Sequence, residues 1–157
     1  MREWIETVSI ALASLLTGIT FIIAFVNYKL LLKQKRVELY ESFRQKMKEN
    51  VDFQKITSML EEDEGGLSDI PILSSYQFLG FFEDISILIK NKLMNPYIAH
   101  YMFAYFALRC CESDNFWFGI NRESIYWKEF NDFVHEMNAI EKCREINHKK
   151  YGEKLMI

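Results

Sequence analysis

Two segments of the chain place positively charged side chains next to amide or aromatic ones. The first contains Arg109, Asn115, Phe116, Trp117, Asn121 and Arg122, and the second contains Lys90, Asn91 and Lys92. Positive charges bind phosphate groups, while aromatic and amide side chains stack on nucleobases or form hydrogen bonds with their edges. Both segments are therefore candidate binding sites for a small anionic ligand that carries flat bases.

The same residues also have a purely structural interpretation. Glu83 lies within an apolar helical pattern, where a buried carboxylate needs a partner, and Arg109 ends the next helix. Phe116 and Trp117 are large enough to fill part of the core. The sequence leaves both interpretations open, so Arg109 is expected either to contact a phosphate or to neutralise Glu83.

Motifs of the common catalytic and metal-binding sites are missing from the sequence. It has no GxSxG, GxxxxGK[ST] or HExxH pattern. No zinc-site spacing relates its cysteines and histidines, which are Cys110, Cys111, Cys143, His100, His135 and His148. We therefore expect a protein that is not an enzyme, binds no metal or cofactor, and keeps its cysteines as free thiols.

A long apolar segment, residues 7–28, must position the rest of the chain. It reads TVSIALASLLTGITFIIAFVNY and contains no charged residue. About 20 apolar residues suffice for a helix to cross the hydrocarbon core of a bilayer. A buried soluble helix would usually be shorter, and a cleaved signal peptide would not continue so far past the Ala11-Leu12-Ala13 pattern. The segment predicts a transmembrane helix, with residues 1–28 as the membrane part and 29–157 as a separate domain.

The charges beside the apolar segment predict its orientation. Arg2 is the only basic residue before it, whereas Lys29, Lys33, Lys35 and Arg36 follow it closely. Basic residues are enriched on the cytoplasmic side of membrane spans. We therefore expect a single-pass protein whose N-terminus lies outside and whose C-terminal domain is cytosolic.

Small and hydroxyl-bearing side chains follow one face of the predicted span. They are Ala13, Thr17, Thr20 and Ala24, at steps of four, three and four, with Ser14 and Gly18 beside them. Helices associate in lipid where small residues let their backbones approach closely. The pattern favours a homo-oligomer, a tetramer before a dimer, although such residues are also common in spans that do not associate.

The remaining residues predict an all-α domain. Nothing breaks the helical pattern from residue 28 to 47, so the span should continue directly into a cytosolic helix. Further helices are expected after Asp52 and Pro71, over residues 97–108 with apolar side chains on every face, and from about Glu123 to His148. The formal net charge from Lys29 onward is 18 − 20 = −2, which gives no general attraction for double-stranded nucleic acid.

The helix after Pro71 carries apolar residues on two faces. Phe78, Phe81 and Phe82 belong to a wide core-facing stripe, while Tyr76, Leu79 and Ile87 lie on the other side around Glu83. This distribution predicts that the helix is covered both by its own domain and by a second subunit.

Several of these features together resemble a known group of proteins. They are the single span, the basic helix after it, the segment YQFLGFFEDI at residues 76–85, the Lys92-Leu93 turn, an aromatic helix and the WKEF segment at residues 127–130. The chain resembles small bacterial membrane-anchored helical proteins of unknown function. In architecture it is also similar to the membrane effectors of type III CRISPR defence.

The second resemblance implies a function and a location. Such effectors are tetramers in the bacterial inner membrane that bind cyclic tetra-adenylate with a cytosolic helical domain and then disturb the lipid bilayer. The resemblance implies that this chain is an antiviral effector that binds a cyclic oligoadenylate. The alternative that the residues leave open is a non-catalytic anchor or scaffold, which presents a helical domain to a protein partner.

Overall fold

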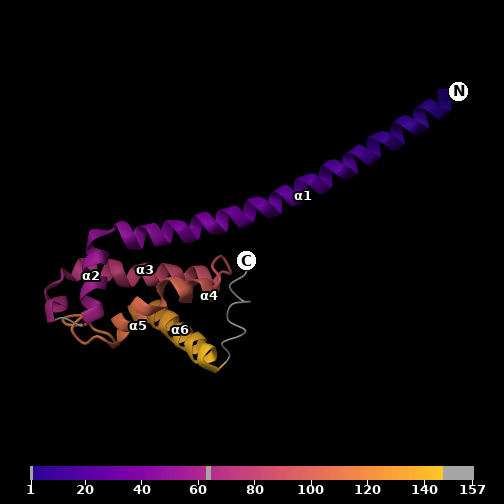
Figure 1. The fold of residues 1–157 in the computed structure, drawn as a ribbon. Helices are drawn as coiled ribbons and strands as arrows, with labels where there is room; N and C mark the ends of the chain where they lie inside the picture. Colours follow the sequence, from indigo (N-terminus) through magenta and orange to yellow (C-terminus); the bar gives the residue numbers. More distant parts are fainter. Residues whose placement is uncertain (1, 63–64, 147–157) are drawn as a thin grey trace. The chain divides into compact units, whose positions relative to one another are not determined.

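The computed structural model describes residues 2–62 and 65–146 of the chain (Figure 1). In chain order the helices are α1 (Arg2–Glu49), α2 (Val51–Glu62), η1 (Gly65–Asp69), α3 (Ile72–Lys90), α4 (Pro96–Ala99), η2 (His100–Ala104), α5 (Tyr105–Glu112), η3 (Ile125–Trp127) and α6 (Lys128–Ile146). Residues 2–62 and 65–146 contain no strand. The prediction of an all-α fold is confirmed.

The chain divides into two compact units, residues 1–41 and 42–157. The division falls inside α1, which is one unbroken helix of 48 residues. The expected continuation of the apolar segment into a further helix is therefore present, because neither Gly nor Pro interrupts residues 28–47.

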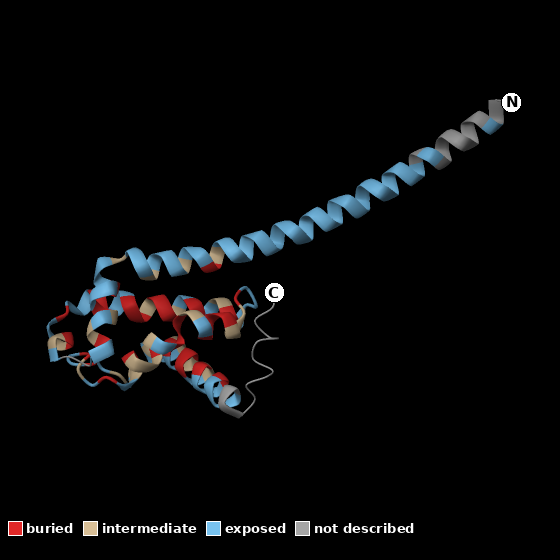
Figure 2. Cartoon of the chain, viewed as in Figure 1, coloured by how far each residue is buried: buried red, intermediate tan, exposed pale blue. Residues whose placement is uncertain are grey.

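In the first unit, α1 is long and apolar enough to cross a membrane. Its described part from Ser14 onward includes an 18-residue window with a mean hydropathy of 1.9, none of which is buried. Figure 2 shows this length of α1 as exposed. Its large apolar side chains are exposed too, and Phe21 is 74% exposed.

The second unit is built around contacts between α3 and α6. α2 packs on α3 and α5, and the helical stretch from α4 to α5 packs on α6. Figure 2 shows buried residues concentrated on α3 and on the segments around it. Phe82 is fully buried, and its ring centroid lies 5.1 Å from that of Phe78 and 5.8 Å from that of Phe133. α3 is also apolar enough to span a membrane, but 44% of its most apolar window is buried, as in a core helix.

The last residues of α1 belong to this second core. Phe43 lies with its ring centroid 5.5 Å from that of Phe81 on α3. The amine of Lys46 is 4.0 Å from a carboxylate oxygen of Asp84. The long helix thus ends in packed contacts within the domain.

The turn between α1 and α2 is made by Asn50 and not by Asp52. The side-chain oxygen of Asn50 accepts hydrogen bonds from the backbone N–H groups of Asp52 (2.9 Å) and Phe53 (3.2 Å). These N–H groups lie in the first turn of α2 and lack helical partners, so Asn50 caps the helix. The Asp52 carboxylate instead accepts a hydrogen bond from the Ser74 hydroxyl at 2.6 Å.

Two predictions about the later helices are wrong in detail. The stretch over residues 97–108 is not buried on every face, because Tyr101 and Tyr105 are 70% and 55% exposed. On the second apolar face of α3, Leu79 is fully buried as expected for a covered face, whereas Tyr76 and Ile87 are 43% and 46% exposed. α6 begins at Lys128, later than predicted, because Ser124 caps the short helix η3 first. The expected end at His148 lies outside the described residues.

Candidate functional site

A groove between the η2–α5 stretch and α6 is a concave site of the second unit. Its volume is about 490 Å³, within the range of small-molecule sites. The lining residues are His100, Tyr101, Ala104, Tyr105, Leu108, Arg109 and Glu112, with Glu141 contributed by α6.

The groove is lined by the part of the structure where the helix changes its form. Asn95 caps α4 by accepting a hydrogen bond from the Tyr97 N–H at 2.8 Å, and Pro96 occupies the first turn. The helix then widens into one π-helical turn at η2, which starts at His100. π-Helical turns occur frequently at functional sites, and this one contributes three lining residues.

Arg109 is the cation of the groove, and its partner differs from the predicted one. Its terminal nitrogen donates a hydrogen bond of 3.0 Å to the backbone carbonyl of Glu61, in the last turn of α2. Such carbonyls have no partner inside their own helix. Its Nε atom is buried and makes no hydrogen bond within the described residues. The Arg109 side chain also lines the groove.

The predicted ion pair between Glu83 and Arg109 is wrong. The Glu83 carboxylate instead accepts a hydrogen bond from the backbone N–H of Phe130, in the first turn of α6. A helix N-terminus attracts negative charge, and this explains how Glu83 is accommodated without an arginine. Burial raises the pKa of Glu83, and the nearby Glu129 and Asp84 raise it further.

The second arginine of the predicted cluster does not join Arg109. The Arg122 guanidinium lies over the Trp117 ring, 5.8 Å from its centroid, and 3.5 Å from the sulfur of Cys111. It also reaches within 3.8 Å of the Asp114 carboxylate. Among the described residues, Arg109 shares no hydrogen bond, ion pair or ring contact with this group.

Core packing and turn formation account for the other members of that cluster. Trp117 is 6% exposed, and its indole nitrogen donates a hydrogen bond of 2.9 Å to the Cys110 carbonyl. Phe116 is also buried. The Asn121 side chain accepts a hydrogen bond from the Glu123 N–H at 3.1 Å, and the Asn115 carbonyl accepts one from the Phe118 N–H at 3.4 Å.

The two lysines at the end of α3 differ in their contacts, because Lys90 is paired with carboxylates and Lys92 is exposed. The Lys90 amine lies 2.5 Å from a Glu129 carboxylate oxygen and 2.7 Å from one of Asp132. These two hydrogen bonds raise the pKa of Lys90 and lower the pKa of both carboxylates. Lys92 is exposed and has a positive φ of 59°, and the Asn91 side chain donates to a carbonyl of α3.

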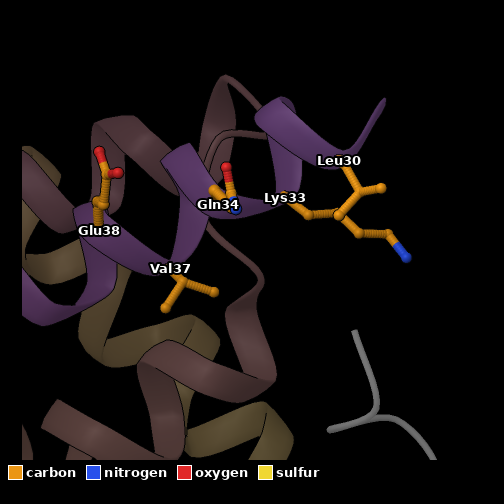
Figure 3. Close-up of a pocket in the computed structure, with 5 residues that line it drawn as sticks. All are labelled: Leu30, Lys33, Gln34, Val37 and Glu38. Carbon is orange, nitrogen blue, oxygen red and sulfur yellow. The ribbon is translucent and has the colours of Figure 1, made fainter. Parts of the chain in front are cut away.

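The small residues of the predicted span lie on α1 and are exposed. They are Ser14, Thr17, Gly18, Thr20 and Ala24, and the side chain of Ala13 lies outside the described residues. A Cβ atom added at Gly18 would meet no atom within 4 Å, so this face is open. Figure 3 shows a separate hollow on α1, lined by Leu30, Lys33, Gln34, Val37 and Glu38. One helix provides its whole lining, which encloses no ligand by itself.

No metal site is formed in residues 2–62 and 65–146, where no group of three His, Cys, Asp or Glu side chains is placed to hold an ion. The three cysteines are free thiols. Burial raises the pKa of the Cys110 thiol well above its usual value, which makes it unreactive.

Sequence reasoning found Arg109 but missed the residues around it. Tyr101 and Tyr105 precede Arg109 at steps of four, a spacing that places all three on one side of a helix. Glu141 could not have been found in this way, because only the folded chain brings α6 to the groove. No protein-family model, curated protein or solved structure matches the chain.

Proposed function

We propose that the chain is a membrane-anchored, non-catalytic effector whose helical domain binds a small anionic second messenger. The observation that carries the proposal is the unbroken helix α1, which begins in an apolar segment and ends in packed contacts with α3. Such a helix connects the apolar segment to the domain without a break in the helical backbone.

In the proposed topology α1 crosses the bacterial inner membrane once. The four basic residues at 29–36 against one at position 2 support a cytosolic domain and an outside N-terminus. Protease protection in sealed vesicles tests this orientation. In vesicles whose lumen corresponds to the cytosol, the domain should be protected from protease added outside. Its cleavage there would overturn the orientation.

The groove at Arg109 is the proposed ligand site. Arg109 also contacts Glu61 at the end of α2, and the start of α2 is hydrogen-bonded to the end of α1 through Asn50. A phosphate that engages the Arg109 guanidinium competes with the Glu61 carbonyl for it. This chain of contacts is the proposed route from the ligand to the anchoring helix.

The proposed messenger is a cyclic oligoadenylate, which the resemblance to CRISPR membrane effectors implies. Its bases need flat surfaces, which Tyr101 and Tyr105 supply, and its phosphates need a cation, which Arg109 supplies. The proposed assembly is a homo-oligomer, a tetramer before a dimer, held partly by the open small-residue face of α1.

Thermal unfolding of the full chain in detergent tests the proposal. A ligand that binds only the folded state raises the apparent stability by RT ln(1 + [L]/Kd). Cyclic oligoadenylates should raise the melting temperature of the parent, and Arg109→Ala should abolish this increase. Arg122→Ala is the matched control, because its guanidinium lies outside the groove beside Trp117. If the messengers leave the parent unchanged, or if both variants respond like the parent, the proposed ligand site is wrong.

One observation favours the scaffold alternative. Phe118, Ile125 and Tyr126 are 71%, 80% and 83% exposed, which is a high exposure for apolar side chains in adjacent turns. A non-catalytic anchor that presents these residues to a protein partner would account for them. A flat response to all cyclic nucleotides, together with a partner lost on Tyr126→Ser, would favour that function.

A further inference from the structure

The groove at Arg109 contains more negative than positive side chains. Glu112 from α5 and Glu141 from α6 line it together with the single guanidinium. Both glutamates are exposed and make no hydrogen bond or ion pair within the described residues. A lining that bound only phosphate would exclude carboxylates, because they repel it.

Ionised carboxylates accept hydrogen bonds but donate none. A ligand that fits the groove therefore needs donors near its phosphate. The ribose of a nucleotide has this property, since its 2′-hydroxyl lies close to the phosphate groups and can donate a hydrogen bond. The base of such a nucleotide has the exposed rings of Tyr101 and Tyr105 to stack on.

We propose that Glu112 and Glu141 make the groove selective for ribonucleotides over deoxyribonucleotides. Their carboxylates accept a hydrogen bond from the 2′-hydroxyl while Arg109 holds the phosphate. The inference rests on the proposed function, because it assigns a sugar preference to the ligand site proposed there. The groove volume of about 490 Å³ accommodates one nucleotide unit of a larger ligand.

Removing the glutamates changes two quantities that must be kept apart. Loss of negative charge raises the affinity for any anion, whichever sugar it carries. Loss of a hydroxyl acceptor lowers the affinity only for the ribose form. The ratio of the two affinities is therefore the informative quantity, since the charge effect cancels in it.

Isothermal titration of the full chain in detergent measures this ratio. The probes are cyclic tetra-adenylate and the analogue in which every sugar lacks its 2′-hydroxyl. The parent should bind the ribose form at least about threefold more tightly, the effect of one modest hydrogen bond. The double variant Glu112→Ala/Glu141→Ala should bind both forms within about a factor of two. Glu123→Ala, an exposed carboxylate outside the groove, is the matched control and should keep the parental ratio.

Each outcome separates the two proposals. Equal binding of both forms by the parent, with binding still lost in Arg109→Ala, overturns the sugar preference and leaves the proposed function in place. A parental ratio in the double variant overturns the role of the two glutamates. If the parent binds neither form, both the preference and the messenger site are overturned.

Discussion

The ion pairs of Lys90 allow a quantitative prediction of its contribution to stability. The prediction also tests whether this lysine, a candidate ligand contact, has a structural role instead. Its amine bridges Glu129 and Asp132 in the first turns of α6 and so joins the end of α3 to the start of α6. Ser86 also donates a hydrogen bond to Glu129 at 3.2 Å. Replacement by methionine keeps most of the side-chain volume and removes only the charge.

The expected loss follows from the exposure of the three groups. Their side chains are 44%, 32% and 42% exposed, so solvent screens both pairs. Exposed ion pairs contribute about 0.2–1 kcal/mol each, so Lys90→Met should lower the free energy of unfolding by about 0.5–2 kcal/mol. For a domain of this size that corresponds to a decrease of about 2–8 °C in melting temperature.

The pKa shifts fix the pH range of this contribution. The two carboxylates have lowered pKa values, so their part is present above the unfolded values near 4 and is lost as the pH falls further. Lys90 has a raised pKa, so its part persists until the pH rises through that value. The difference between parent and Lys90→Met should be constant from about pH 6 to 9 and should shrink towards pH 3.

Thermal unfolding of the full chain in detergent at pH 7 and pH 3 measures these differences. Lys92→Met is the matched control, because the Lys92 side chain is exposed and forms no hydrogen bond or ion pair within the described residues. The control should stay within about 0.5 kcal/mol of the parent. Equal melting temperatures for parent and Lys90→Met at pH 7 and low salt would refute a structural role and return Lys90 to the set of ligand candidates.

Three further predictions concern the core, a half-buried carboxylate and the apolar segment. Phe82→Ala should lower the free energy of unfolding by about 3–5 kcal/mol, whereas Phe118→Ala should change it by less than about 0.5 kcal/mol; equal losses in chemical denaturation would contradict the packing described. Glu83→Gln should gain stability relative to the parent as the pH rises from 4 to 7, because the raised pKa of Glu83 makes its ionised form unfavourable in the folded state; melting curves that stay parallel would argue against this. Gly18→Leu should weaken self-association in detergent, as sedimentation would show, and an unchanged mass would remove this face from the interface.

The features predictable from sequence are those set by local spacing. Two such features appear in the structure as predicted, and each lies within a single helix. One is the uncharged stretch at 7–28, and the other is the stripe of Phe78, Phe81 and Phe82. The cap at Asn95 is equally local, since it depends on two adjacent residues. The helix start expected after Asp52 was wrong because Asn50 and Asp52 are both residue types that cap helices, and only the path of the chain decides which one does.

The candidate site was less predictable because its contacts join distant parts of the chain. Arg109 and Glu83 suggested an ion pair by charge alone, whereas the folded chain satisfies Glu83 with a helix N-terminus and Arg109 with a helix C-terminus. The sequence indicates where a helix ends but does not indicate which distant side chain will meet its terminal backbone groups. A search restricted to charged side chains therefore could not have found these partners.

The position of Arg109 leads to a final prediction. Its guanidinium donates to the Glu61 carbonyl and also lines the groove, so a phosphate in the groove would compete with α2 for it. Lysine keeps the positive charge but lacks the planar fork that makes two directed contacts. Arg109→Lys should therefore retain more of the ligand-free melting temperature than Arg109→Ala, because its amine can still reach one partner, yet it should lose most of the temperature increase caused by the messenger. If Arg109→Lys responds to the messenger like the parent, charge alone holds the phosphate, and competition between the ligand and Glu61 cannot be the route by which binding reaches α1.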